Sequence, residues 1–243
     1  MNREFTVSDG VTEAFPHLRI HLIAVEGLRN GEPWPKAAAA LDELESDAAA
    51  GEWTALADDD PRIASWHAAY RSFGTNPKRT RPSAEALQRR LAKSGRLPRI
   101  SPAVDAYNLA SVRFGVPAGA FDLSALGERV DIRHAAESDG FTPLGEPEVR
   151  EAPAAGEVVY AQGDEVLTRH WNHRDADATK VTPATVSAVF VLDSVAEEAH
   201  AAVDAAADGL AQLLSEGSTV TAHRVIDAAS RSVRLDGEGV SGR

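Results

Sequence analysis

An uninterrupted apolar segment at residues 185–192, TVSAVFVL, constrains the fold of this chain more than any other segment. Its length suits one β-strand, and a strand that is apolar on both faces is typical of the buried centre of a sheet. Asp193 and Ser194 follow directly, and Glu197 stands three residues after Ser194, which is the pattern of a helix-capping box. We therefore expect a central strand that ends in a carboxylate, followed by a long helix capped by Ser194.

The other segments mix strands and helices without an internal repeat. Strands are expected at residues 18–25 and 129–134, and a hairpin at residues 158–168, from their apolar or alternating patterns. Capping, proline and periodicity signals predict further helices at residues 35–50, 61–73, 83–95 and 104–113, the third of them capped by Ser83. Because strands and helices do not alternate regularly, the sequence predicts an α+β (mixed α/β) fold with a central sheet flanked by helices.

The length and composition describe an ordinary globular protein. A chain of 243 residues has room for one large domain with an added segment. We expect residues 1–60 to form a small N-terminal extension, a strand and a helix packed on a main domain at residues 61–240. The absence of cysteine excludes disulfides, thiolate metal sites and a cysteine nucleophile. Since there is no apolar run of about 20 residues and no apolar N-terminal signal, we expect a cytoplasmic protein without a membrane partner.

Basic residues gather in one segment of an otherwise acidic chain. The net charge is −12, but residues 71–99 hold nine lysines and arginines and a single acid, Glu85. A basic surface on an acidic protein can direct a polyanion to one face. The alternative is that these charges only solvate a helix face. The residues that we expect to contact RNA are Lys78, Arg79, Arg81, Arg89, Arg90 and Lys93.

Two polar segments are candidates for a small-substrate site. One surrounds Asp105 and Asn108, and the other is the threonine-rich loop before the apolar strand. Neither contains a nucleotide-binding glycine loop, a metal-ligand quartet or a nucleophile elbow. His170, His173 and Asp175 have loop spacing without a further ligand set, so we predict no metal and no cofactor.

The segment VDAYNLASVRFGVPAGAFDLSALG, residues 104–127, contains a VD-x-x-N run, a Gly-x-Pro turn and AFDL. The segment DATKVTPATVSAVFVLDS joins a threonine-containing loop to a strand that ends in an acid. In these features residues 75–195 resemble the B3/B4 domain, the tRNA-editing module of the phenylalanyl-tRNA synthetase beta chain, and especially its free-standing members. The matching positions are Asp105, Asn108, Gly115, Pro117, Phe121, Asp122, Leu123 and Asp193.

The resemblance implies a B3/B4-like single domain that binds aminoacylated tRNA and hydrolyses the ester of a mischarged amino acid in trans. Such an ester is reactive, so a site that positions water and stabilises an oxyanion needs neither a nucleophile nor a metal. A synthetase or translation factor is a further partner that the resemblance suggests. The catalytic residues that it implies are Asp193, Thr179 and Asn108. The substrate-binding residues that it implies are Asp105, Gly119, Trp171 and His173.

Three departures from the family pattern leave alternatives open. Gly119 stands where the family has a histidine, Asp193 replaces a glutamate, and Asn172 and His173 replace the Gly-Gly entry to the threonine loop. The alternatives are a deacylase for another amino acid, a non-catalytic tRNA- or RNA-binding protein that retains the fold, and a small-molecule hydrolase or binding protein. Structural roles are open too: Asp193 as a helix cap, Asp105 and Asn108 as turn-stabilising groups, and Trp171 as a core residue.

Overall fold

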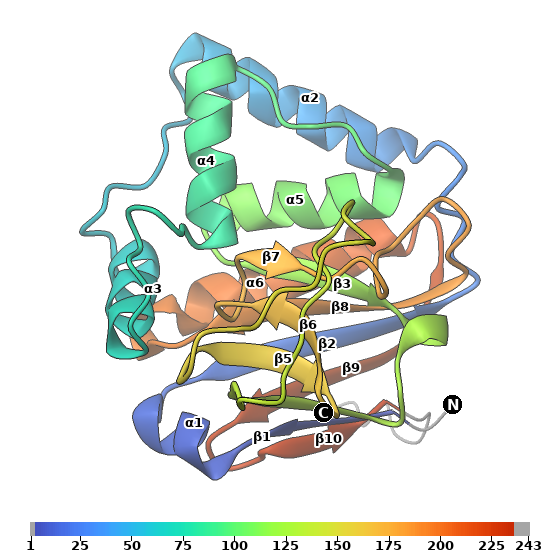
Figure 1. Cartoon of the computed structure of the whole chain (residues 1–243). Coiled ribbons are helices and arrows are strands. Elements are labelled where there is room, and N and C mark those ends of the chain that lie inside the picture. The colour runs from blue at the N-terminus through green and yellow to red at the C-terminus, as the bar shows by residue number, and fades with distance from the viewer. Residues whose placement is uncertain (1–2, 236–243) are drawn as a thin grey trace.

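The computed structural model describes residues 3–235 of the chain (Figure 1). Two β-sheets pack face to face, and helices cover the outer face of the smaller sheet. This architecture confirms the predicted α+β fold. The predicted domain end at residue 240 lies outside the described residues. No helix in the described part of the chain is long and apolar enough to cross a membrane.

The smaller sheet is antiparallel and contains the apolar strand that was predicted to be central. Its spatial order is β3 (Ala118–Asp122), β8 (Ser187–Ser194), β2 (Arg19–Glu26) and β9 (Thr219–Asp227). The inner strand β8 is buried along almost its whole length. Because side chains alternate along a strand, Val189 and Val191 face the larger sheet, whereas Phe190 and Leu192 face the helices.

The larger sheet supplies the other half of the core between the sheets. Its strands in spatial order are β10 (Ser232–Arg234), β1 (Glu4–Val7), β4 (Arg129–His134), β5 (Val158–Gln162), β6 (Glu165–Arg169) and β7 (Arg174–Asp175). β1 and β4 are parallel, and the other neighbours are antiparallel. The predicted strand at residues 129–134 is β4, and the predicted hairpin is β5–β6. Residues 1–60 contribute β1 to this sheet and β2 to the smaller one.

Four of the helices form layers on the outer face of the smaller sheet. Their bounds, with those of two short 3-10 turns, are α1 (Asp9–Ala14), α2 (Pro35–Ala50), α3 (Pro61–Ser72), α4 (Ser83–Ser94), α5 (Pro102–Phe114), η1 (Leu123–Ala125), η2 (Glu197–Ala199) and α6 (His200–Leu214). α5 and α6 pack directly on the sheet, and α2 and α4 lie outside α5. Trp66 and Tyr70 of α3 instead close the core between the two sheets.

Two predictions of helix capping are wrong. Ser194 is the last residue of β8 and donates to the carbonyl of Ala196 (3.1 Å), while α6 begins later, at His200. The N-cap of α4 is Pro82, and Ser83 makes no capping hydrogen bond. In both places the capping pattern is present in the sequence, but strand pairing or packing positions the residue elsewhere.

Candidate functional site

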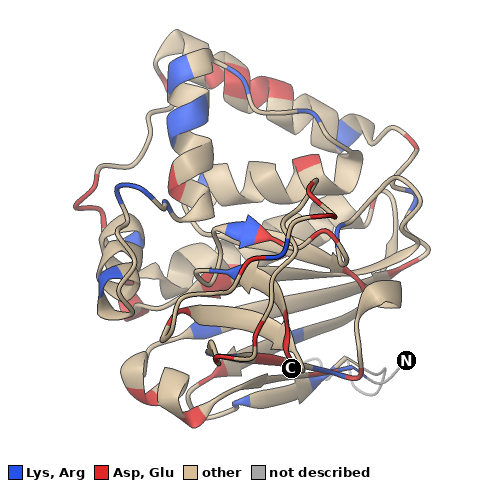
Figure 2. Cartoon of the chain, in the orientation of Figure 1, with Lys and Arg blue, Asp and Glu red and all other residues tan. Residues whose placement is uncertain are grey.

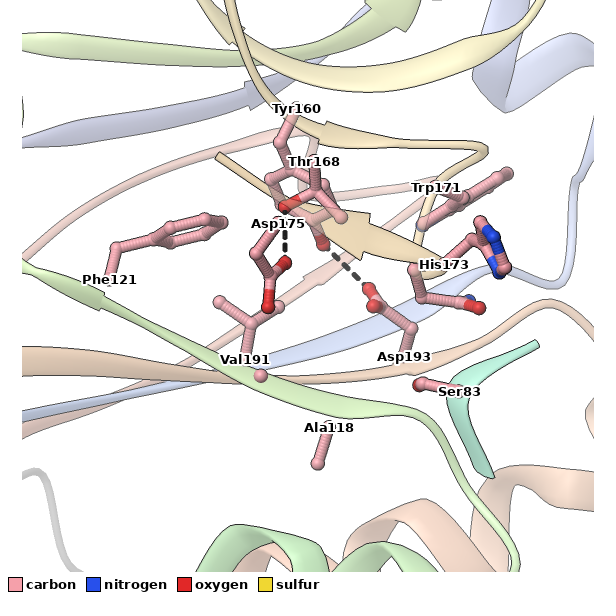
Figure 3. A pocket seen from close by; sticks show the side chains of 12 residues that line it. Ser83, Ala118, Phe121, Tyr160, Thr168, Trp171, His173, Asp175, Val191 and Asp193 are labelled. Atoms are coloured by element: carbon pink, nitrogen blue, oxygen red, sulfur yellow. Dashed lines mark hydrogen bonds between the residues drawn. The ribbon is translucent and has the colours of Figure 1, made fainter. Parts of the chain in front are cut away.

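A small pocket opens between the two sheets, where β3 and β8 of one sheet approach β5, β6 and β7 of the other (Figure 3). Its volume is about 60 Å³. The start of α4 closes one side. The side chains and backbone that line it belong to Ser83, Ala118, Gly119, Phe121, Tyr160, Thr168, Trp171, Asn172, His173, Asp175, Val191 and Asp193. Four of the predicted site residues are among them, namely Gly119, Trp171, His173 and Asp193.

Asp193 reaches the pocket because of its place in β8. It has the same parity as Val189 and Val191, so it shares their intersheet face. The hydroxyl of Tyr160 donates to Asp193 Oδ1 over 2.6 Å. Burial raises the pKa of this carboxyl to about 7, and the donors Tyr160 and Trp171 oppose the shift only in part. Asp193 is therefore a pocket residue held by Tyr160, and not the cap of α6.

Asp175 brings a second carboxylate to the same cavity, from β7. Thr168 Oγ1 donates to Asp175 Oδ1 over 3.0 Å. Burial raises the pKa of Asp175 to about 6. The sequence pattern suggested this residue only as a metal ligand, and no group of three His, Cys, Asp or Glu side chains in residues 3–235 is placed to hold a metal ion. No local signal distinguished Asp175, because its partner Thr168 comes from the neighbouring strand.

Three polar atoms of the pocket residues are buried without a hydrogen-bond partner. They are Ser83 Oγ, Trp171 Nε1 and Asn172 Nδ2. Buried polar atoms in native proteins are nearly always paired, and each exception calls for an explanation. The amide of Asn172 is oriented by Tyr70, whose hydroxyl donates to Asn172 Oδ1 over 2.8 Å. All three residues line the same cavity, so unpaired polar atoms gather at its wall.

Trp171 is a core residue that also contributes to this site. Its ring makes edge-to-face contacts with Phe15 and Trp66 at centroid distances of 5.1 and 5.3 Å, and the side chain is completely buried. No ring face is therefore open for a base to stack on. Its indole N–H lies close enough to Asp193 to lower the pKa of that carboxyl, yet it forms no aligned hydrogen bond.

The segment that carries Trp171, Asn172 and His173 has strained backbone. His170 and Trp171 have φ angles of 49° and 69°, in the left-handed region that bulky residues rarely adopt. The buried carboxylate of Glu157 holds this segment, because it accepts the backbone N–H of His170 (2.9 Å) and the Nε and Nη2 groups of Arg169 (3.0 and 2.9 Å). Strain maintained by a buried ion pair is typical of functional sites.

His173 stands at the mouth of the pocket with one ring nitrogen fixed. Its Nδ1 lies 2.7 Å from the carbonyl oxygen of Arg81, and since a carbonyl can only accept, Nδ1 carries the proton. In the neutral ring Nε2 is then a proton acceptor. His170 bonds Thr75 Oγ1 through Nδ1 (2.9 Å), and burial lowers its pKa to about 4, so it is neutral. Both histidines thus tie the site to the loop before α4.

Gly119 lies in the edge strand β3, opposite Val191. A Cβ atom at this position would meet no other atom within 4 Å. The open space beside Gly119 is part of the pocket.

Three predicted site residues lie outside the lining of this pocket. Thr179 is buried, and its carbonyl accepts the backbone N–H of Asp122 over 2.9 Å. Asp105 Oδ1 accepts the backbone N–H of Ile100 over 2.8 Å, which fixes the turn that enters α5. Asn108 is buried within α5.

Of the six basic residues that were predicted to contact RNA, two form ion pairs with an acid in the part of the chain that the structure describes and four do not. Arg81 and Arg89 bind the buried carboxylate of Glu85 at 3.2 and 2.6 Å. Lys78, Arg79, Arg90 and Lys93 are exposed, and none of these four forms an ion pair with any residue in the range 3–235. Figure 2 shows this positive charge on α4 and on the loop between α3 and α4. Through Ser83 and the Arg81–His173 hydrogen bond, this loop borders the pocket.

Comparison with known proteins identifies the family. Among solved structures, the chain is similar to an N-terminal fragment of the phenylalanyl-tRNA synthetase beta subunit from Pyrococcus horikoshii, with 13% identity and a TM-score of 0.46. The match covers 91% of this chain and 49% of that one, so the chain spans about half of its length. No curated protein matches. A family model described as the B3/4 domain matches residues 65–216, more than half of the sequence. The chain therefore belongs to the B3/4 domain family.

Proposed function

We propose that this protein hydrolyses the ester bond of a mischarged aminoacyl-tRNA, acting in trans. The observation that carries the proposal is the pocket itself, in which unpaired donors and two carboxylates lie beside an unpaired basic surface. Membership of the B3/4 family supports a tRNA-related role. Residues 61–240 hold every residue of the pocket and the basic surface, and we propose this part as the functional domain.

The proposed chemistry is the attack of water on an activated ester. The water oxygen bonds to the carbonyl carbon, the bond from that carbon to the ribose oxygen breaks, and the proton that leaves the water ends on the ribose oxygen. His173 Nε2 is the proton acceptor at the pocket mouth. Asn172 Nδ2 and Trp171 Nε1 are the unpaired donors for the developing oxyanion. Asp193 holds the aminoacyl group. Thr179 and Asn108 receive no step, since neither lines the pocket.

A panel assay tests this proposal. Single-turnover deacylation is measured on tRNAs charged with cognate and non-cognate amino acids, and at least one ester should be hydrolysed well above its spontaneous rate. Inactivity on every tRNA, together with tight tRNA binding, would favour the non-catalytic RNA-binding alternative. That alternative is supported by the absence of a side chain at Gly119, where the family has a histidine. If the protein neither deacylates nor binds any tRNA, the remaining alternative is a small-molecule hydrolase or binding protein.

Removing the unpaired basic residues should weaken tRNA binding and its salt dependence. The variant replaces Lys78, Arg79, Arg90 and Lys93 by alanine. For every phosphate that is no longer neutralised, the slope of log affinity against log salt should fall by about 0.7 to 0.9, because fewer counterions are released on binding. The measurement is tRNA affinity by filter binding or anisotropy at several salt concentrations.

A matched control uses arginines that already have acidic partners. Arg99 contacts Asp42 and Glu45, and Arg113 contacts Glu43. Their replacement by alanine should leave the salt slope unchanged. Equal slopes for all three proteins, including the fourfold variant, would remove this surface from the tRNA interface.

Filling the space beside Gly119 should lower activity strongly without unfolding the protein. Gly119→Val adds a side chain where a Cβ atom has no neighbour within 4 Å, and valine suits a β-strand. We expect the free energy of unfolding to change by less than about 1 kcal/mol. Deacylation should fall at least tenfold, since the added methyl groups occupy the cavity. Urea unfolding and single-turnover kinetics of the variant test this, and an unchanged rate would separate the pocket from the reaction.

A further inference from the structure

The pocket holds two carboxylates and no cation. None of the twelve lining residues is a lysine or an arginine. The arginines that neighbour it along the chain bind acids elsewhere, because Arg169 pairs with Glu157 and Glu151, and Arg174 pairs with Glu151 and Glu146. Figure 3 shows the carboxylates of Asp175 and Asp193 directed into the same space, one from β7 and the other from β8. Two carboxyl groups thus line the cavity, and no lysine or arginine among the lining residues pairs with either of them.

Each carboxylate is only half satisfied. Asp193 accepts one aligned hydrogen bond, from Tyr160, with the indole N–H of Trp171 nearby but not aligned, and Asp175 accepts one, from Thr168, in both cases at Oδ1. The Oδ2 atom of each residue makes no hydrogen bond within residues 3–235. Burial without a counter-charge raises the pKa of Asp193 to about 7 and that of Asp175 to about 6. A bound cation would supply both the missing donors and the missing charge.

We infer that this pocket binds a primary ammonium group between Asp175 and Asp193, and that the ligand is an α-amino acid linked through its carboxyl group. An ammonium group has three donors, which match the two free carboxylate oxygens and leave one donor for water or a neighbouring acceptor. The volume of about 60 Å³ holds only a small group, which favours the α-ammonium over a long cationic side chain. The unpaired donors of Asn172 and Trp171 suit the carbonyl oxygen of such a ligand. The identification of the carboxyl link as an ester rests on the proposed function.

Small ligands test the ammonium site without any tRNA. Alaninamide carries the α-ammonium group, lactamide has a neutral hydroxyl in its place, and N-acetyl-lysinamide has only a side-chain ammonium. Binding is measured by chemical-shift titration of the full-length protein at pH 5, 6 and 7.5. Alaninamide should bind at least tenfold more tightly than lactamide at pH 7.5. Preferential binding of N-acetyl-lysinamide would keep the ammonium site and reassign it to an amino-acid side chain. Equal affinity for alaninamide and lactamide would overturn the inference.

The affinity for alaninamide should rise between pH 5 and pH 7.5. The carboxylates ionise in this range, while at least half of the α-amino groups stay protonated up to a pH of about 7.7. The other titratable groups of the pocket are Tyr160, whose pKa burial raises well above its usual value, and His173. Because His173 also lines the pocket, a His173→Gln variant is titrated too, and a pH dependence that it retains belongs to the carboxylates. A flat affinity from pH 5 to pH 7.5 would contradict the inference.

Asparagine variants locate the site. Asp175→Asn and Asp193→Asn should each weaken alaninamide binding at least tenfold and reduce its pH dependence. The matched control is Asp177→Asn, because Asp177 is two residues from Asp175 but pairs with Lys180 (2.7 Å) and does not line the pocket. Thermal melts of all three variants accompany the titrations. If a variant fails to fold, the comparison of alaninamide with lactamide on the wild-type protein still tests whether the pocket binds an ammonium group.

Esters with and without the α-ammonium group test the ammonium site and the deacylase activity separately. An aminoacyl-tRNA and its α-hydroxyacyl counterpart differ only in the ammonium group. Hydrolysis of both at the same rate would leave the deacylase standing and overturn the ammonium site. Selective binding of alaninamide by a protein that deacylates no tRNA would keep the ammonium site and reject the deacylase.

Discussion

The Asp193→Asn protein is expected to deacylate its tRNA at least tenfold more slowly while becoming more stable than the wild type at pH 8. A tenfold loss corresponds to about 1.4 kcal/mol of transition-state stabilisation. Asparagine has nearly the same shape and can still accept the hydrogen bond from Tyr160. It lacks the negative charge that we assign to holding the substrate. Its effect on activity is therefore electrostatic, and single-turnover kinetics should show it most clearly above pH 7.

The gain in stability follows from the raised pKa of Asp193. In the unfolded chain an aspartate has a pKa of about 3.9, whereas burial raises that of Asp193 to about 7 in the fold. The folded state thus holds this proton more tightly, and the resulting stability is present below pH 4 and is lost as the pH rises towards 7. Asparagine never ionises and avoids that loss. The variant should match the wild type near pH 4 and exceed it at pH 8, by at most about 4 kcal/mol.

Urea unfolding at pH 4, 6 and 8 measures this difference. Asp177→Asn is again a suitable control, because Asp177 is a partly exposed acid that pairs with Lys180, and the pKa of its carboxyl is lowered, not raised. A variant that is less stable than the wild type at all three pH values would mean that Asp193 has a structural role that asparagine cannot fill. Higher stability combined with lower activity is the usual result when a strained or charged site is neutralised.

The sequence predicts the apolar parts of this molecule better than the polar ones. The apolar composition of residues 185–192 was enough to predict a buried strand, and this segment forms most of β8. The alternation of β8 also determines the face on which Asp193 lies. That face could not be chosen from the sequence, since both sides of the strand are apolar. The helix-cap interpretation of Asp193 failed because a capping box is a local signal, and the chain makes a further turn before α6 begins.

The polar contacts of the pocket could not be predicted from the sequence for another reason. Tyr160 meets Asp193, and Thr168 meets Asp175, only through sheet packing and strand pairing between separate segments. Ser83 appeared to be a helix cap by its position. Residue patterns describe neighbours in sequence, whereas these contacts depend on register and on how two sheets face each other. The resemblance to a known family gave Gly119 and His173, which no spacing rule would have selected.

Counting charges in the sequence also failed to show which basic residues are paired in the fold. Glu85 is the single acid of residues 71–99, and a count treats it as negligible. In the fold it is buried, and it binds Arg81, Arg89 and His67. Two of the six predicted RNA contacts are thus committed to an internal ion-pair cluster. The four that remain free are the ones whose replacement should change tRNA binding.

Replacing Glu157 by alanine should produce the largest loss of stability of any single change proposed for this site. Glu157 is completely buried and holds Arg169 through two hydrogen bonds and His170 through its backbone N–H. Removal of one partner from a buried ion pair costs up to about 3–5 kcal/mol, and here Glu151 remains as a second, less buried partner of Arg169, so we expect the lower part of this range. The strained backbone of His170 and Trp171 would also lose its anchor.

The pH dependence of this loss distinguishes the ion pair from simple packing. Burial raises the pKa of Glu157, but the hydrogen bonds from Arg169 and the nearby charges outweigh burial and hold the pKa below its ordinary value. The ion pair therefore stabilises the fold at pH values above the ordinary glutamate pKa of about 4.3, and this contribution disappears as the pH falls through the lower folded value. The difference between wild type and Glu157→Ala should be large at pH 7 and should shrink towards pH 3.

Three further variants show which interaction causes the loss of stability in Glu157→Ala. Glu157→Gln keeps an acceptor for His170 N–H but loses the charge, so its stability should lie between those of wild type and Glu157→Ala. Glu148→Ala removes an exposed acid from the preceding loop and should change little. Glu157→Ala combined with Arg169→Met removes both charges, and it should recover part of the stability if the guanidinium that has lost its buried partner is the cause. Equal stability of Glu157→Ala and wild type at pH 7 would mean that the segment from Arg169 to His173 is held by its aromatic packing alone.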